Sequence, residues 1–122
     1  MNFISKALKR RNKIKSPDYF VPSIEESEIK EGKMKAVRIR GNAILLVRQG
    51  GQVFGVSNKC PHMGCSLESG ILNDHVIMCP CHGWNFDVRN GSYLEIKGIT
   101  LACYRSKIEN GKVYVEILPE KM

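Results

Sequence analysis

Short runs of alternating apolar and polar side chains recur along most of the chain, and this alternation predicts half-buried β-strands. In Lys35–Arg40, for example, basic side chains alternate with Val37 and Ile39, so one face of the strand is expected to lie in a core. The runs predicted as strands are Tyr19–Val21, Lys35–Arg40, Asn42–Gln49, Gln52–Val56, Ile71–Met78, Cys103–Glu109 and Lys112–Leu118.

Glycine-containing turns separate these runs. Gly50–Gly51 and Asn110–Gly111 each lie between two predicted strands, at the two-residue spacing of a tight hairpin, and Asn90–Gly91 is a further turn signal. The acidic stretch Glu25–Gly32 is expected to form one helical turn or an acidic loop. Regular short strands joined by such turns predict an all-β, antiparallel sandwich or barrel.

Length and hydropathy point to one globular domain. The chain has 122 residues, of which 43% are hydrophobic, and this suffices for a single core but not for a second catalytic domain. No stretch reaches the roughly 18–20 apolar residues that span a bilayer, and the N-terminus lacks the apolar region of a signal peptide. We therefore expect a cytoplasmic protein without a transmembrane segment, with its domain at residues 19–122.

The net charge of +7 is concentrated at the N-terminus. Residues 1–16 carry six basic and no acidic side chains, whereas the rest of the chain holds thirteen basic and twelve acidic ones. Residues 1–18 are expected to form a flexible basic arm, with weak contact to an acidic partner or a membrane surface as the alternative. Nucleic-acid binding is not expected, because no interleaved aromatic side chains or recognised module accompany the charge.

Two short loops carry the candidate metal ligands. Cys60 and His62 stand in the first loop, and Cys79 and His82 stand in the second, so each loop offers one thiolate and one imidazole. Two cysteines on one iron and two histidines on the other are the ligands of one type of [2Fe–2S] cluster. A single structural zinc remains the alternative, although its paired ligands are usually two to four residues apart rather than one.

The ligand spacing Cys-x-His-x16-Cys-x-x-His resembles that of the Rieske family. This resemblance implies antiparallel sheets with a cluster-binding subdomain inserted at about residues 58–87, and it covers the chain from about residue 19 onward. It also implies one [2Fe–2S] cluster held by Cys60, His62, Cys79 and His82.

A second pair of cysteines lies beside these ligands. If both loops converge on one cluster, Cys65 and Cys81 come close together, which is the geometric requirement for a disulfide. The two positions also match the loop-bridging disulfide of Rieske proteins from cytochrome bc-type complexes. Two reduced, packed thiols are the alternative, since cytosolic thiols are usually kept reduced.

Trp84 and Phe86 stand where the bc-type pattern has a serine and a tyrosine whose hydroxyls donate to cluster sulfurs. Neither residue has a hydroxyl, and hydrogen bonds to sulfur raise the reduction potential of such clusters. We therefore expect these two residues, as packing around the cluster, to place the potential in the lower to middle part of the Rieske range of roughly −150 to +300 mV.

The resemblance implies a one-electron carrier like a soluble Rieske-type ferredoxin, with redox proteins as donor and acceptor, and not an enzyme. One alternative is the electron-transfer subunit of an oxidoreductase of the oxygenase, nitrite reductase or arsenite oxidase type. The other is a structural zinc-binding domain. Outside the loops, Cys103 is expected to be a buried inert thiol and His75 a surface histidine without a metal.

Overall fold

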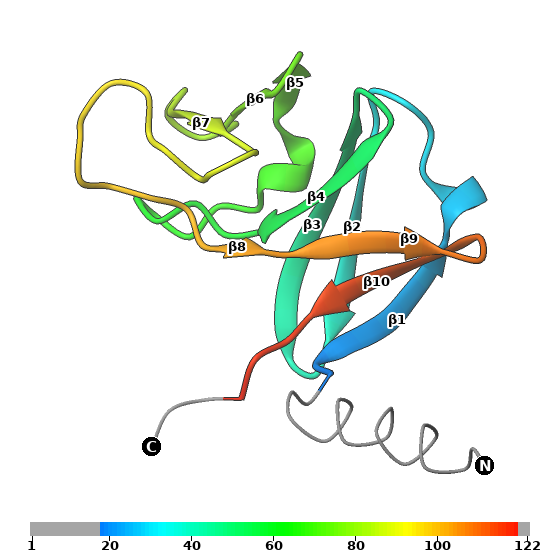
Figure 1. The fold of residues 1–122 in the computed structure, drawn as a ribbon. Coiled ribbons are helices and arrows are strands. Elements are labelled where there is room, and N and C mark those ends of the chain that lie inside the picture. The colour runs from blue at the N-terminus through cyan, green and yellow to red at the C-terminus, as the bar shows by residue number, and fades with distance from the viewer. Residues whose placement is uncertain (1–17, 120–122) are drawn as a thin grey trace, which may run out of the picture.

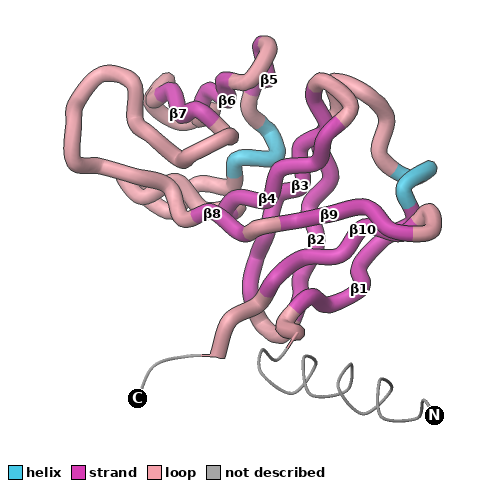
Figure 2. Tube along the Cα trace, in the orientation of Figure 1, coloured by secondary structure: helices cyan, strands magenta, loops and turns pink. Residues whose placement is uncertain are grey.

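The computed structural model describes residues 18–119, and its strands form three antiparallel sheets (Figures 1 and 2). Residues 1–17 lie outside the described part, so the predicted basic arm stays a prediction. None of the helical segments within residues 18–119 is long and apolar enough to cross a membrane. The strands are β1 (Phe20–Glu25), β2 (Met34–Ile39), β3 (Asn42–Gln49), β4 (Gln52–Ser57), β5 (Ile71–Asn73), β6 (Val76–Met78), β7 (Asn85–Asp87), β8 (Cys103–Tyr104), β9 (Ser106–Glu109) and β10 (Lys112–Glu116).

Two of the sheets form the base of the molecule and the third lies above one end of it (Figure 1). The base sheets have the strand orders β1-β10-β9 and β2-β3-β4-β8, and the third sheet has the order β5-β6-β7. All neighbouring strands within these sheets pair antiparallel, so the all-β prediction is confirmed.

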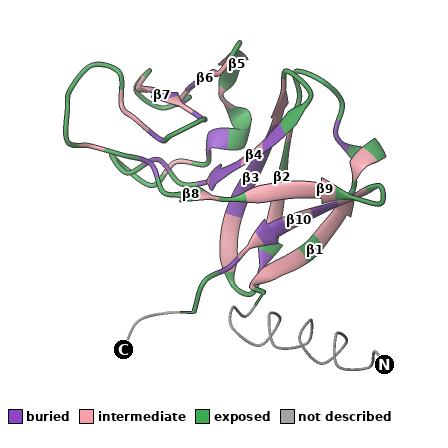
Figure 3. Ribbon diagram, viewed as in Figure 1, coloured by how far each residue is buried: buried purple, intermediate pink, exposed green. Residues whose placement is uncertain are grey.

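Strand β3 faces a separate apolar core on each side, which explains its uninterrupted apolar run. Ile44 and Leu46 point into the core between the two base sheets, whereas Leu45 and Val47 point into the core beneath the third sheet. All four side chains have 0% relative exposure, and this buried centre of the molecule is visible in Figure 3. Because side chains alternate between the faces of a strand, one segment of chain anchors both halves of the molecule.

Most of the predicted elements are observed, with two corrections. The hairpin turns at Gly50–Gly51 and Asn110–Gly111 join β3 to β4 and β9 to β10, and Glu26–Glu28 forms a single 3₁₀ turn. The single strand predicted over Ile71–Met78 is wrong, because the chain reverses at Asp74, which has a φ of 61°. Two three-residue strands therefore replace it. The single strand predicted over Cys103–Glu109 is also wrong, because the chain divides at Arg105 into β8 and β9, which belong to different sheets.

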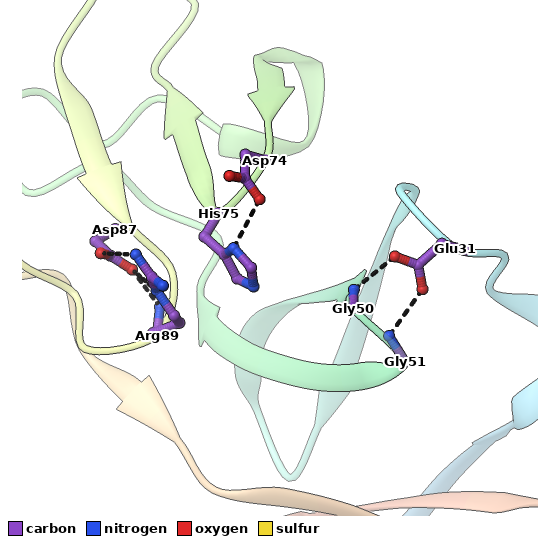
Figure 4. Close-up of polar contacts among 7 residues, drawn as sticks. All are labelled: Glu31, Gly50, Gly51, Asp74, His75, Asp87 and Arg89. Carbon is purple, nitrogen blue, oxygen red and sulfur yellow. Dashed lines mark hydrogen bonds and ion pairs between the residues drawn. The ribbon is translucent and has the colours of Figure 1, made fainter.

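Glu31 ties the loop before β2 to the tip of the β3–β4 hairpin. Its carboxylate accepts hydrogen bonds from the backbone amides of Gly50 and Gly51, as Figure 4 shows. These two amides, Gly51 first, lower the pKa of Glu31 below its ordinary value of 4.5, because they stabilise the charged form. A depressed pKa in the folded state means that the ionised group stabilises the fold.

We predict that Glu31→Gln lowers the stability of the protein at neutral pH and that this difference shrinks in acid. The contribution of Glu31 is complete above its unfolded pKa and is lost as the pH falls below 4.5 through the lowered folded value. Urea denaturation of both proteins at pH 7 and at pH 3 measures the difference. As a control, Glu109→Gln on the exposed β9–β10 hairpin should have little effect at either pH, and a Glu31 effect that is equal at both would contradict the account.

Candidate metal centre

The two cysteine–histidine loops close with the same pair of backbone hydrogen bonds. In each loop the amide of the first cysteine donates to the carbonyl five residues later, at 2.9 Å from Cys60 and 2.7 Å from Cys79. The amide of a glycine, Gly64 or Gly83, donates back to that cysteine's carbonyl at 2.7 and 3.0 Å. Both glycines have a positive φ, of 77° and 74°, which residues with a Cβ adopt only with strain.

This closure presents sulfur and nitrogen donors in two different environments. The thiols of Cys60 and Cys79 belong to buried residues with 3% and 2% exposure, and both line the core beneath the third sheet. The rings of His62 and His82 are exposed and meet edge to face, with centroids 4.8 Å apart and an interplanar angle of 72°. The structure thus brings the four predicted ligand residues together as one thiol pair and one imidazole pair.

The Cys60 thiol is buried in the same core as the Cys79 thiol. Burial raises the pKa of Cys60 above its ordinary value, and the neighbouring Cys79 adds to this, whereas the amides of His62 and Met63 oppose it by donating to the sulfur. A positive ion at the sulfur pair offsets the cost of burying thiolates, because metal binding requires and favours the deprotonated thiol.

A disulfide joins the two loops, as the sequence predicted. Cys65 in the first loop is bonded to Cys81 in the second, with their Cα atoms 6.5 Å apart. The sulfur atoms of Cys65, Cys79 and Cys81 lie within 4.8 Å of one another. Two of these three atoms are held in the disulfide and have no thiolate to offer, so this sulfur group is not a metal site of its own.

Two aromatic rings form a stacked column on the His62 ring, and a third packs against them at a tilt. The Trp84 ring lies parallel to the His62 ring, with centroids 4.3 Å apart and an interplanar angle of 9°. Tyr93 stacks on Trp84 at 4.3 Å and 12°. Phe86 is fully buried beneath, tilted toward both Trp84 and Tyr93.

Tyr93 is the member of this column that sequence reasoning missed. It pairs with Phe86 in an isolated antiparallel bridge, because the chain reverses between them at the turn containing Asn90–Gly91. That turn signal was visible in the sequence, and its position after the second loop was the available hint that a later residue returns to the site.

One of the two predictions about residues outside the loops is wrong. Cys103 is exposed rather than buried, although partial burial of its thiol still raises the pKa above its ordinary value. His75 lies at the surface only in part, with its side chain 22% exposed. Its ring packs edge-on against Phe54, and its Nδ1 lies 2.8 Å from an Asp74 carboxylate oxygen (Figure 4). The short strands of the third sheet hold this histidine against the β3–β4 hairpin.

The donor set fits a [2Fe–2S] cluster of the type that two cysteines and two histidines hold. Such a cluster needs two thiolates and two imidazoles within reach of one small group. Here two free thiols are buried in one core, and two imidazoles lie against each other at the surface. One-residue spacing in the first loop is less suited to a single tetrahedral zinc.

Comparisons with known proteins agree on one family. The family model described as "Rieske [2Fe-2S] domain" matches residues 19–113. The chain is 31% identical over 94 residues to the ferredoxin component of the alkene monooxygenase system of Xanthobacter autotrophicus, covering 75% of this chain and 77% of that protein. It is 34% identical over 89 residues to human apoptosis-inducing factor 3, covering 72% of this chain but only 15% of that much longer protein.

Solved structures show the same similarity. The ferredoxin of carbazole 1,9a-dioxygenase from Nocardioides aromaticivorans superposes with a TM-score of 0.71 at 26% identity, covering 79% of this chain and 97% of that one. A chain in the complex of reduced oxygenase and oxidized ferredoxin in carbazole 1,9a-dioxygenase superposes with a TM-score of 0.74, also at 26% identity. That superposition covers 82% of this chain and 94% of that one.

We predict that the double variant Cys65→Ser, Cys81→Ser is less stable than the native protein by about 3 kcal/mol. The two cysteines are 16 residues apart, and opening a loop of this length restores conformational entropy to the unfolded chain. Equilibrium urea denaturation measures the loss. Cys103→Ser, which removes an exposed free thiol, serves as the control, and equal stability of the double variant and this control would contradict the prediction.

Proposed function

This chain belongs to the Rieske [2Fe–2S] family, and from that premise we propose that it is a one-electron carrier of the ferredoxin kind rather than an enzyme. The observation that carries the proposal is the arrangement of two buried thiols and two exposed imidazoles on loops with the same backbone closure. The similarity to ferredoxin components of oxygenase systems supports it.

We assign Cys60 and Cys79 to one iron and His62 and His82 to the other. When bound, the cluster accepts and releases a single electron, and this is the only redox chemistry that the proposal requires. The thiolates supply negative charge at the buried end, and the neutral imidazoles leave the other iron easier to reduce. Because both imidazoles are exposed, an iron that they held would be accessible to a redox partner at the surface.

The chain's own residues shelter the buried end of the site and leave the imidazole end open. Leu45, Leu67 and Phe86 are each fully buried in the core that contains the two thiols, so water is excluded there. Met63, between the first histidine and the loop glycine, is 65% exposed. The open end therefore combines two imidazoles with one flexible apolar side chain, which suits contact with a redox protein.

A second candidate function is that of an electron-transfer part of a larger oxidoreductase. Support comes from relatives in which a domain like this one forms a small part, as in apoptosis-inducing factor 3, and from the similarity to a chain in a ferredoxin–oxygenase complex. Co-purification with a flavin- or metal-containing partner would favour this alternative. Under either candidate, the donor and acceptor are redox proteins and any catalysis resides in the partner.

Electron paramagnetic resonance of the dithionite-reduced protein, together with iron and acid-labile sulfide analysis, tests the proposal. We expect two irons and two sulfides per chain, and a rhombic signal that appears only on reduction. Replacing any one proposed ligand, for example His62→Ala or Cys79→Ser, should abolish or strongly change this signal. Cys103→Ser should leave it unchanged, because Cys103 lies outside both loops.

A colourless, correctly matured protein with one zinc per chain would contradict the proposal and establish the zinc domain instead. A cluster that persists with an unaltered signal after replacement of His62 or His82 would contradict the ligand assignment while preserving the electron carrier.

The two faces of β3 provide a further prediction with a matched control. Leu45→Ala and Leu46→Ala should each destabilise the fold by about 2–5 kcal/mol, since both side chains are fully buried. Leu45 shares its core with the two thiols, whereas Leu46 lies in the core between the base sheets. At a temperature where both variants remain folded, visible absorbance of the cluster should therefore decay faster in Leu45→Ala, and equal decay rates would contradict this prediction.

A further inference from the structure

The two proposed histidine ligands have different surroundings. One face of the His62 ring is covered by the parallel indole of Trp84, at a centroid distance of 4.3 Å. For His82, the aromatic contact found among residues 18–119 is the edge-to-face contact with His62 itself. Within the described part of the chain, a stacked ring therefore holds one of the two imidazoles and not the other.

The indole of Trp84 is in turn held from behind. Tyr93 covers its other side at 4.3 Å and nearly parallel, so Trp84 is enclosed between an imidazole and a phenol ring. Trp84 is also tied to the second loop, because its carbonyl accepts the hydrogen bond from the Cys79 amide at 2.7 Å. A residue that closes the second loop thus reaches across to the histidine of the first.

The position of Tyr93 is fixed by backbone contacts on both sides. Its amide donates to the Ile99 carbonyl at 3.1 Å, and the next amide, of Leu94, donates to the Asn85 carbonyl of β7 at 3.0 Å. The bridge to Phe86 holds Tyr93 beside the same strand. These contacts fix the segment of residues 92–100, which holds Tyr93 against Trp84.

We propose that Trp84, backed by Tyr93, is a positioning residue that fixes the orientation of the His62 imidazole and lowers the reduction potential of the site. This inference rests on the proposed function, because it assigns the column a role only if His62 is a ligand. A ring that is stacked in this way keeps its free nitrogen and its metal-binding nitrogen in fixed directions. Contacts around ligating histidines generally have this orienting effect.

Two physical effects determine the direction in which Trp84 shifts the reduction potential. The electron-rich face of an indole stabilises positive charge on a neighbouring group, and the oxidised site is the more positive of the two states. The stacked rings also keep water from one side of His62. Water stabilises the reduced state, which carries one additional negative charge, so excluding water disfavours reduction. Both effects favour the oxidised form, so removing the indole should raise the potential.

The chain contains a single tryptophan, so its fluorescence reports Trp84 alone. The test uses the cluster-containing protein and the variants Trp84→Ala, Trp84→Phe, Tyr93→Ala and Tyr93→Phe. Tyr114→Ala, a tyrosine in β10 away from the column, is the control. For each protein we would measure the midpoint potential by voltammetry, the nitrogen couplings of the reduced state by pulsed electron paramagnetic resonance, and the emission of Trp84 where it is present.

We expect Trp84→Ala to raise the potential and to change the coupling of one histidine nitrogen while the other stays constant. Tyr93→Ala should cause a smaller shift of the same sign and move the Trp84 emission to longer wavelength. The conservative variants Trp84→Phe and Tyr93→Phe, which keep a flat ring, should restore most of the native values. Tyr114→Ala should match the native protein in all three measurements.

Unchanged potentials and nitrogen couplings in Trp84→Ala and Tyr93→Ala, with only a loss of thermal stability, would overturn the inference and reduce the column to packing. If Trp84→Ala fails to fold, Tyr93→Ala and the two phenylalanine variants decide by the same criteria. Absence of a [2Fe–2S] cluster in the native protein would be seen before any variant is compared, and it would overturn the proposed function together with this inference.

Discussion

The site depends on holding two loops, separated by a whole β-hairpin, in one fixed relation. Each loop closes its own turn with two backbone hydrogen bonds and a glycine in the left-handed region, but those bonds do not position one loop against the other. The Cys65–Cys81 disulfide and the burial of Cys60 beside Cys79 provide that second constraint. With it, four donors that are distant along the chain come together as one thiol pair and one imidazole pair.

The base of the molecule supports this arrangement through a single strand. Strand β3 contributes alternate side chains to the core between the base sheets and to the core that contains the thiols, so the two halves share one rigid element. At the turn between β3 and β4, the Glu31 carboxylate accepts a hydrogen bond from the Gly51 amide. Nearby, His75, in the turn between β5 and β6, packs against Phe54 of β4. The short β5-β6-β7 sheet is thereby attached to a larger one.

The parts of the structure that follow local rules could be predicted from the sequence. Alternating side chains identified most strands, Gly50–Gly51 and Asn110–Gly111 identified two hairpins, and the loop spacing identified the Cys65–Cys81 pair. The stacking of Tyr93 could not be predicted, because it depends on how far the chain after Asn90–Gly91 returns over the second loop. The exposure of Cys103 was missed for a similar reason: β8 pairs with β4 over only two residues and leaves its thiol near the surface.

The proposed site has two chemically different ends, one of buried cysteine thiols and one of exposed histidine imidazoles, on a β scaffold. Mössbauer spectroscopy of the ⁵⁷Fe-enriched protein tests that difference most directly. We expect two distinct iron environments in equal amounts, and on reduction only one of them, the site with nitrogen ligands, should become ferrous. Two equivalent irons, or a spectrum without a [2Fe–2S] component, would contradict the assignment of Cys60 and Cys79 to one iron and of His62 and His82 to the other.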